Sequence, residues 1–136
     1  MVQKRPDRTF GVPHDTFWEW CGRGELRLQR CRQCGELSWP AVATCGACGG
    51  GALEWVPMSG EGKVVSWCTF ERDYYQGAFP IPWTNIIVEL AEGPFFISEP
   101  GNFAEQDMAF GMPVKVDFLP CEDSKGTFSL PIFNRA

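Results

Sequence analysis

The chain has 136 residues, of which 44% are hydrophobic, 14% aromatic and 21% charged, and its formal net charge is −5 at pH 7. Six Trp and 11 Phe in so short a chain exclude a disordered polypeptide, and no apolar run approaches the roughly 18 residues of a membrane span. The N-terminus has no apolar stretch typical of a secretory signal, so we expect a cytoplasmic location. In that reducing compartment, seven Cys indicate metal ligands or free thiols rather than disulfides.

Charge is unevenly distributed along the chain. Residues 1–35 contain seven Lys and Arg against four Asp and Glu, whereas residues 36–136 contain five against 13, a net of −8. Such an acidic segment repels phosphate backbones, which argues against nucleic acid as a ligand. The 15 Gly and 11 Pro favour short strands and turns over a helical bundle.

The N-terminal part is expected to be a loose arm over residues 1–12 followed by a helix of about two turns. Asp15 or Thr16 is the expected N-cap, with Glu19 completing a capping box, and the nearby glycines end the helix. The helix carries a face of large aromatic side chains, namely Phe17, Trp18 and Trp20. One interpretation is packing against the rest of the chain. The other is that this wide aromatic face docks a partner subunit.

The cysteines give the most specific signal. An alternating strand over residues 25–30 leads into a doubled CxxC motif with a ten-residue spacer and a return strand near residues 53–55. The four cysteines of this motif are Cys31, Cys34, Cys45 and Cys48. Glycine follows each pair, as a tight knuckle requires, and two knuckles brought together place four sulfurs in the tetrahedron that Zn²⁺ prefers. The pattern predicts a closed structural zinc site; iron, a redox dithiol and a metal-free site are the alternatives.

Three cysteines lie outside this motif: Cys21, Cys68 and Cys121. Cys68 falls inside a predicted strand and is expected to be a small buried residue, whereas Cys121 lies by a turn and is expected to be at least half-exposed. No basic neighbour marks any of the three as an activated nucleophile.

From residue 60 onward the pattern is β throughout. Strands are expected over residues 63–70, 83–90, 94–98, 114–118 and 127–133. Five short strands in about 77 residues suit a small Greek-key barrel. Catalytic motifs are missing, because His14 is the single histidine and there is no phosphate-binding or dinucleotide-binding glycine motif.

These features occur in an order that resembles the DUF35 family of zinc-ribbon OB-fold proteins. The likeness covers about residues 13–133 and rests on the following motifs: Phe17-Trp18, Gly24-Glu25-Leu26, Leu28-Gln29-Arg30-Cys31-Arg32-Gln33-Cys34-Gly35, Trp39-Pro40, Cys45-Gly46-Ala47-Cys48, Leu53-Glu54-Trp55, Gly60-Glu61-Gly62-Lys63-Val64, Pro82-Trp83, Val88-Glu89-Leu90, Glu92-Gly93 and Gly111-Met112-Pro113-Val114. One departure is Trp83, where Tyr is expected in many members.

The resemblance implies a mainly β fold, with a short N-terminal helix, a rubredoxin-like zinc ribbon and then a five-stranded OB-fold barrel. We expect an arm, helix and ribbon over residues 1–56 and the OB-fold over residues 57–136. The resemblance also implies that the chain is a non-catalytic accessory subunit in the acyl-CoA chemistry of lipid or aromatic acid metabolism. Such a subunit stabilises a thiolase-fold partner, a thiolase or a retro-aldolase, and helps to line its acyl-CoA site.

The basic residues beside the zinc motif are candidates for contacts to CoA phosphates: Arg23, Arg27, Arg30 and Arg32. The alternative is that they form a solvated face of the helix and strand. Two other functions stay open from the sequence. One is a single-stranded nucleic-acid-binding ribbon and barrel, which would need a basic groove, and the other is an autonomous thiol or hydrolytic enzyme, which would need a catalytic partner for His14.

Overall fold

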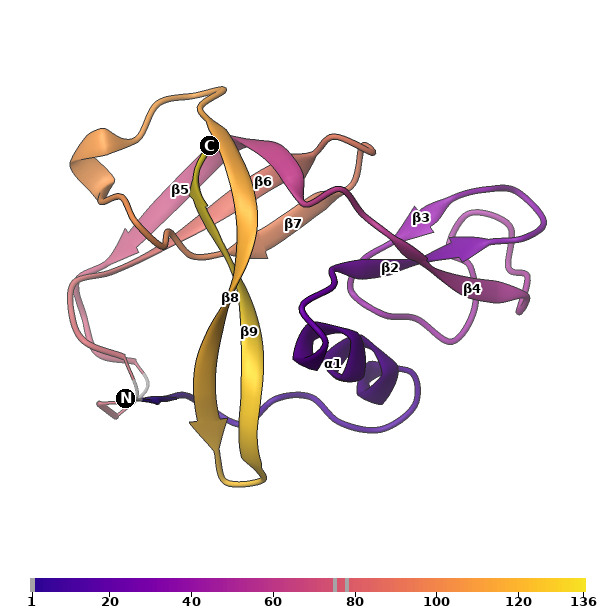
Figure 1. Ribbon diagram of the computed structural model, residues 1–136, viewed down its shortest axis with the longest axis horizontal. Coiled ribbons are helices and arrows are strands. Elements are labelled where there is room, and N and C mark those ends of the chain that lie inside the picture. The colour runs from indigo at the N-terminus through magenta and orange to yellow at the C-terminus, as the bar shows by residue number, and fades with distance from the viewer. Residues whose placement is uncertain (1, 75, 78) are drawn as a thin grey trace.

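The computed structural model describes residues 2–74, 76–77 and 79–136 and contains two β-sheets that lie side by side (Figure 1). Its elements, in chain order, are β1 (Gln3–Lys4), α1 (His14–Gly22), β2 (Arg27–Cys31), β3 (Leu37–Ser38), β4 (Leu53–Pro57), β5 (Glu61–Phe70), β6 (Trp83–Leu90), β7 (Phe95–Ser98), the 3₁₀ turn η1 (Glu105–Asp107), β8 (Pro113–Asp123) and β9 (Gly126–Arg135). The fold is mainly β, as the sequence predicted.

The smaller sheet is the zinc ribbon, with strand order β3-β2-β4 and antiparallel pairing throughout. Strand β2 pairs with β4 over its full length, from Arg27 opposite Pro57 to Cys31 opposite Leu53. This register places the first cysteine knuckle, which follows β2, beside the loop that enters β4. The knuckles therefore lie at the end of the ribbon that is farther from the barrel (Figure 1).

The larger sheet is the OB-fold barrel, with strand order β1-β8-β5-β6-β7 and with β9 paired to β8. Strand β5 pairs with β8 over residues 61–63 and with β6 over residues 62–70, and a bulge between Val64 and Ser66 shifts its register against β6. Beyond β7, Gly101 donates its N–H to the carbonyl oxygen of Phe133, and this contact brings the chain after β7 against β9. The five predicted barrel strands are all present, and β8 and β9 are longer than expected.

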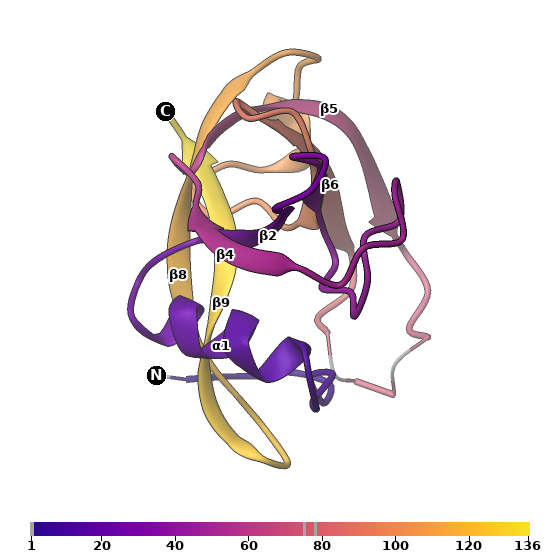
Figure 2. The same cartoon turned by 90° about the vertical axis from the view of Figure 1, so that its right-hand side faces the viewer.

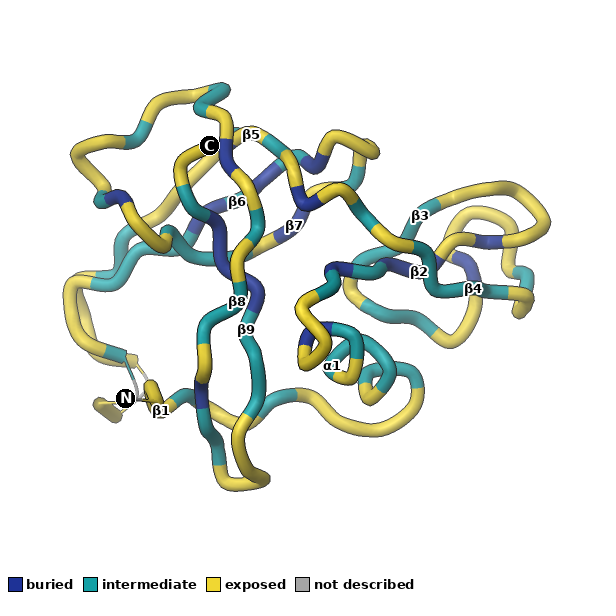
Figure 3. The backbone as a smooth tube through the Cα atoms, in the orientation of Figure 1, coloured by how far each residue is buried: buried dark blue, intermediate teal, exposed yellow. Residues whose placement is uncertain are grey.

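Ribbon and barrel share one hydrophobic core. Leu26 and Leu28, at the start of the ribbon, belong to the same buried cluster as Val64, Ile86 and other inward-facing residues of the barrel. The buried segments accordingly run from β2 across into β5, β6 and β9 (Figure 3). Helix α1 lies below this junction, beside β9 (Figures 1 and 2). The ribbon is therefore packed on the barrel as one body.

The N-terminal part differs from the expectation in two respects. Helix α1 begins at His14, and Pro13 is its N-cap without a side-chain cap, so the capping box predicted from Thr16 and Glu19 is wrong. Asp15 instead lies in the first turn and accepts a hydrogen bond from the N–H of Gly11. The preceding arm is also not loose, because β1 pairs in parallel with β8 and two arginines of the arm form ion pairs with the barrel.

Cys68 and Cys121 lie in environments opposite to those expected from the sequence. Cys68 is exposed on β5, whereas Cys121 on β8 is fully buried. The arm lies beside Cys121, since β1 pairs with β8 at Gln3 and Cys121 and the side chain of Arg5 lies near the thiol. Among the described residues, no helix is long and apolar enough to cross a membrane.

Candidate functional site

The four cysteines of the doubled CxxC motif converge at the tip of the ribbon. Their Sγ atoms all lie within 4.8 Å of one another, and the Cys31–Cys48 and Cys34–Cys45 pairs are each 3.5 Å apart. Tetrahedral zinc with Zn–S bonds of about 2.3 Å separates its sulfurs by about 3.8 Å. The cluster therefore fits the predicted structural zinc ion, to which each knuckle contributes two thiolates.

Two glycines make the knuckles possible. Gly35 and Gly49 adopt φ of +81° and +76°, a conformation that residues with a Cβ rarely adopt. Each donates its N–H to the carbonyl oxygen of the first cysteine of its pair, Cys31 or Cys45, over 2.8 Å. The two turns are thus built alike, as the repeated sequence pattern predicts.

Backbone N–H groups favour the thiolate form most at the first cysteine of each knuckle. At Cys34 and Cys48 the backbone hydrogen bonds of Glu36 and Gly50 are outweighed by hydrogen bonds with neighbouring thiols and by burial, so the pKa of each is raised. Hydrogen bonding from the backbone of Cys34 is the main reason that the pKa of Cys31 is lowered to about 7. The backbone of Cys48 and of Ala47 likewise lowers the pKa of Cys45, with the Ala47 nitrogen 3.4 Å from the Cys45 sulfur. Four protein sulfurs complete a tetrahedral shell and leave no position for water, so this site holds structure together.

The aromatic residues predicted to dock a partner make contacts within the chain. Phe17 packs on Phe96 of the barrel core, with ring centroids 6.4 Å apart. Trp18 contacts Phe128 of β9 edge to face and donates its indole N–H to the carbonyl oxygen of Thr9. All three helix aromatics, including Trp20, are half-buried, so part of each side chain stays accessible to a partner.

The four arginines near the ribbon differ in how far they are already paired. Arg30 and Arg32 both approach the carboxylate of Glu54, and Arg27 pairs with Glu25 while it stacks on the ring of Trp20. Arg23 is exposed, and its guanidinium lies 5.0 Å from the centre of the Trp20 ring. No carboxylate in the described part of the chain forms an ion pair with it. Arg23 is therefore the arginine of this set best placed to meet a phosphate.

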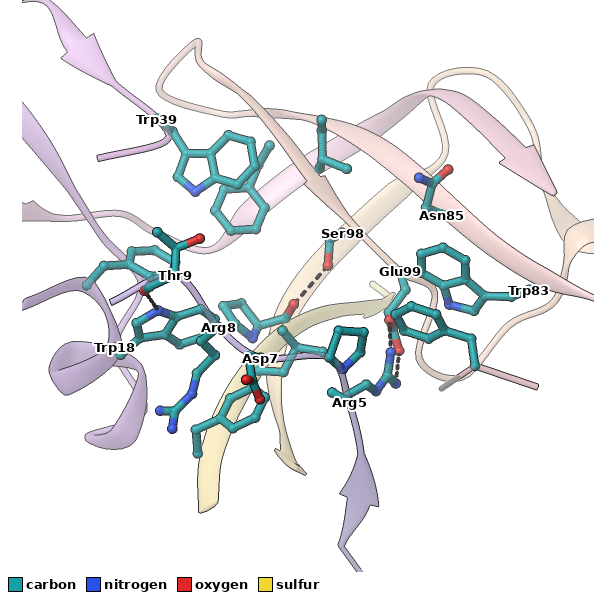
Figure 4. Close-up of a pocket in the computed structure, with 18 residues that line it drawn as sticks. Arg5, Asp7, Arg8, Thr9, Trp18, Trp39, Trp83, Asn85, Ser98 and Glu99 are labelled. Carbon is teal, nitrogen blue, oxygen red and sulfur yellow. Dashed lines mark hydrogen bonds and ion pairs between the residues drawn. The ribbon is translucent and has the colours of Figure 1, made fainter. Parts of the chain in front are cut away.

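A cleft that the sequence did not reveal lies between the arm, α1 and the open side of the barrel (Figure 4). It has a volume of about 380 Å³. Seven of its 18 lining residues are aromatic: Phe17, Trp18, Trp39, Phe79, Trp83, Phe96 and Phe128. Arg5 and Arg8 reach across one side of it, and each is bound to a carboxylate of the barrel, Glu99 or Asp123.

Sequence reasoning also missed two polar anchors. Gln29, a polar residue of the alternating strand, is only 3% exposed. Arg8 forms a two-point ion pair with Asp123, 115 residues further along the chain. The local sequence pattern reveals neither the contact of Gln29 with Val42 nor that of Arg8 with Asp123, because each partner lies in another segment of the chain.

Within the residues that the structure describes, His14 is part of no catalytic constellation. His14 is the first residue of α1, and no hydrogen bond in the described part of the chain joins it to a hydroxyl, thiol or carboxylate. Burial raises the pKa of the Cys21 thiol to about 12, which opposes its use as a nucleophile at neutral pH.

The fold and the cysteine cluster together define a zinc-ribbon OB-fold protein. Residues 18–54 match the family model described as the ChsH2 rubredoxin-like zinc ribbon domain, and residues 55–119 match the ChsH2 C-terminal OB-fold domain. The chain belongs to this DUF35 family, with a ribbon and an OB-fold in the predicted order.

Relatives of known description include subunits of acyl-CoA enzymes. The chain is 31% identical over 111 residues to the benzoylsuccinyl-CoA thiolase subunit BbsA of Thauera aromatica, covering 77% of this chain and 75% of that one. It is 28% identical over 87 residues to a DUF35 domain-containing scaffold protein of Pyrococcus furiosus, covering 60% of each. It is 30% identical over 123 residues to a probable enoyl-CoA hydratase alpha subunit of Thermomonospora curvata, a match that covers 90% of this chain and only 37% of that protein.

Solved structures agree with this assignment. A chain of the Ltp2-ChsH2(DUF35) aldolase superposes with a TM-score of 0.82 at 27% identity, over 95% of this chain and 98% of that chain. A DUF35-family protein of unknown function from Sulfolobus solfataricus shares the fold, with a TM-score of 0.58 at 18% identity over 78% of each chain.

Proposed function

We propose that this chain is a non-catalytic accessory subunit that stabilises a thiolase-fold enzyme acting on acyl-CoA, either a thiolase or a retro-aldolase. Similarity to a thiolase subunit, to a scaffold protein and to part of an aldolase complex supports this proposal. The observation that carries it is the closed four-cysteine cluster, which offers structure and no open metal position. The chemistry then belongs to the partner.

A second surface joins the helix aromatics as a candidate for binding that partner. Phe95 and Ile97 on the outer face of β7 are 57% and 52% exposed, more than any aromatic residue of α1. They line an apolar groove of about 460 Å³ together with Trp39, Pro40, Val65, Ser66 and Ile87. An exposed apolar groove of this kind is typical of protein interaction sites.

Substitutions separate the two candidate surfaces. In co-purification with the thiolase-fold enzyme, Trp18→Ala tests the helix and Phe95→Ala tests β7. Loss of a central aromatic anchor costs about 2 kcal/mol or more of binding free energy. Phe110→Ala is the matched control, because Phe110 is 76% exposed and lines neither the cleft beside α1 nor the groove at β7. Retained binding in both test variants would show that neither surface docks the partner.

We further propose that acyl-CoA lies at the shared interface and that Arg23 contacts its phosphates. In the assembled complex, Arg23→Ala should raise KM for acyl-CoA while kcat stays near the wild-type value, because the lost contact is remote from the reacting atoms. Arg135→Ala is the control, since Arg135 is exposed at the other end of the chain. An unchanged KM in Arg23→Ala would remove Arg23 from the CoA site.

Activity measurements test the central proposal. The purified chain alone should show no turnover of short or long acyl-CoA substrates, whereas the enzyme should gain activity or lifetime when the chain is added. Turnover by the isolated chain that disappears in His14→Ala would overturn the accessory role, since His14 is the one histidine available for acid–base chemistry.

A further inference from the structure

Two sheet edges lie on opposite sides of a groove where the ribbon meets the barrel. One edge is β7, the last strand in the order of the larger sheet, and the other is β3, the first strand in the order of the smaller. A cavity of about 540 Å³ lies between them, lined by β3 on one side and by Pro94 and Phe95 on the other. It continues into the apolar groove at β7, because Trp39, Pro40 and Phe95 line both spaces. We call this continuous space the β3–β7 groove.

The backbone of β7 leaves polar groups free along this groove. Leu90 of β6 donates its N–H to the carbonyl oxygen of Pro94 over 2.9 Å, which fixes the pairs of β6 and β7 that are hydrogen-bonded. Because bonded and non-bonded pairs alternate in an antiparallel ladder, the N–H and C=O groups of Phe95 and Ile97 point away from β6. Outside that ladder, no hydrogen bond in the described part of the chain involves either residue. Two donors and two acceptors are therefore available.

The same edge is already paired a few residues further along. Glu99 accepts a hydrogen bond from the N–H of Phe133 over 3.2 Å, and Gly101 donates its N–H to the Phe133 carbonyl oxygen over 2.8 Å. Glu99 and Gly101 continue the two-residue spacing of Phe95 and Ile97, so their backbone groups face the same side. The position beside β7 is thus filled by β9 from residue 99 onward and open over residues 95–97.

Nothing in the sequence of β7 protects this open edge. Natural sheets shield their edges with charged residues, prolines or bulges. The strand Phe95–Ser98 carries no charge, and Phe95 and Ile97 are 57% and 52% exposed. Across the groove, the hydrogen bond from Cys31 to the carbonyl oxygen of Glu36 marks a bonded pair of β2 and β3, so the backbone groups of Leu37 also point away from their own sheet. Exposed apolar edges with free backbone groups are complementary to an extended segment of another chain.

The charge of the groove indicates which kind of segment fits. Glu36 and Glu92 line a further cavity that continues the groove at its Pro94 end, and no Lys or Arg is among the described residues that line these spaces. A second copy of this chain is a poor match, because its own residues 92–99 carry two carboxylates and no basic residue. Charge complementarity favours an apolar segment with Lys or Arg at the end that reaches Glu36.

We infer that an extended, apolar segment of the thiolase-fold partner adds as a strand to the free edge of β7 and places a basic side chain beside Glu36. This inference rests on the proposed function, since it states how that partner is held. The main chain of the added strand supplies affinity through hydrogen bonds to Phe95 and Ile97. Its alternate side chains enter the apolar groove and supply specificity.

Two substitutions at one position separate strand addition from simple apolar contact. Ile97→Ala keeps the outward N–H and removes the side chain, whereas Ile97→Pro also removes the N–H, which the pairing with β6 does not use. In calorimetric titrations with the thiolase-fold enzyme from the same genome, we expect Ile97→Pro to bind about tenfold more weakly than Ile97→Ala. Zinc content and melting temperature verify that both variants are folded.

Amide hydrogen exchange tests the same point on the wild-type protein. The amides of Phe95 and Ile97 should exchange at least about tenfold more slowly in the complex than in the free chain, because each gains an acceptor or is covered by the added strand. The amide of Phe96, which faces β6, is the internal control and should be protected in both states. Mass spectrometry with residue-level fragmentation reads the three amides separately.

A charge reversal tests the basic end of the segment. Glu36→Lys should weaken binding about threefold, and less so at high salt, whereas Glu71→Lys, an exposed residue outside the groove, should leave binding unchanged. Equal binding of Glu36→Lys and wild type would overturn the assignment of a basic residue to that end.

The outcomes distinguish this inference from the accessory role. A stable complex in which the Phe95 and Ile97 amides exchange as fast as in the free chain overturns strand addition and leaves the accessory role standing, as does equal binding of Ile97→Pro and Ile97→Ala. A free chain that is dimeric by light scattering and becomes monomeric in Ile97→Pro would assign the edge to a second copy and overturn the inference. Separate elution of chain and enzyme overturns the accessory role and the inference with it.

Discussion

The side-chain amide of Gln29 is hydrogen-bonded to both backbone polar groups of Val42. Its Nε2 donates to the Val42 carbonyl oxygen over 2.9 Å, and its Oε1 accepts from the Val42 N–H over 2.7 Å. Val42 lies in the loop between β3 and the second cysteine knuckle. One buried glutamine on β2 therefore fixes the loop that carries Cys45 toward the metal.

Replacing Gln29 by Leu should lower the free energy of unfolding by about 2 kcal/mol, because two hydrogen bonds are lost and the Val42 groups are left unpaired. Thermal unfolding followed by circular dichroism measures the change. Gln106→Leu is the control, since Gln106 is exposed on η1, and its melting temperature should equal that of the wild type. Equal stability of Gln29→Leu and wild type would show that the loop is held by other contacts.

Removal of the metal should destabilise the barrel as well as the ribbon. A structural zinc site contributes on the order of 10 kcal/mol to folding at neutral pH, and Leu28 of the ribbon belongs to the barrel's core cluster. We expect one zinc per chain by elemental analysis, and a lower melting temperature for the whole chain in Cys45→Ser. Cys68→Ser should keep both zinc and stability, because Cys68 lies outside the cluster. Folded, metal-free wild-type protein would contradict the zinc assignment.

Acid should weaken the attachment of the arm. The hydrogen bonds from Arg8 hold the pKa of Asp123 well below its ordinary value. A carboxyl whose pKa is depressed on folding stabilises the protein fully above its unfolded value of about 3.9, and this contribution is lost as the pH falls through that value toward the folded one.

Stability between about pH 5 and pH 2 should therefore decline less steeply in Asp123→Asn than in the wild type, and the variant should be less stable at pH 7. Denaturant titrations at several pH values measure this difference. Glu105→Gln, at an exposed carboxyl, should retain the wild-type slope. If the Asp123→Asn protein shows the full wild-type acid sensitivity, the Arg8–Asp123 pair does not contribute to it.

Single-stranded nucleic acid should not bind at physiological salt. OB-folds that hold single strands combine stacking aromatics with a positive groove, and here both guanidinium groups at the cleft are neutralised by carboxylates. The acidic balance of residues 36–136, a net of −8, adds to this. An anisotropy titration at about 150 mM salt should show no saturable binding. Micromolar affinity with a steep dependence on salt would favour the nucleic-acid function instead.

Sequence patterns predicted the parts of this molecule that depend on local spacing. The doubled CxxC with Gly35 and Gly49 indicated the zinc knuckles, and the period-two alternation around Val114 and Val116 indicated a barrel strand. Such features depend only on residues that are close together in the chain, so the sequence alone predicts them.

Where a feature depends on contacts between distant segments, the sequence-based prediction was either wrong or not made. Cys121 is buried on a strand that pairs with the arm, and nothing near residue 121 in the sequence indicates that pairing. Cys68 lies on the exposed face of a strand whose register is shifted by the bulge at Val64, and a bulge changes which side each later residue faces. The aromatic cleft between the arm, α1 and the barrel likewise depends on several distant segments meeting. The proposed domain boundary at residues 56 and 57, the partner-binding aromatics and the CoA-binding arginines stay predictions.

Size-exclusion chromatography with light scattering tests the accessory role most directly. The chain should be co-expressed with a thiolase-fold enzyme from the same genome, and the mass of the eluted species compared with that of each protein alone. We predict a single joint peak whose mass is the sum of whole numbers of both subunits, and a lower yield of soluble enzyme when the chain is omitted. Separate elution of the two proteins at micromolar concentration, with an enzyme that is stable and fully active alone, would contradict the proposed function.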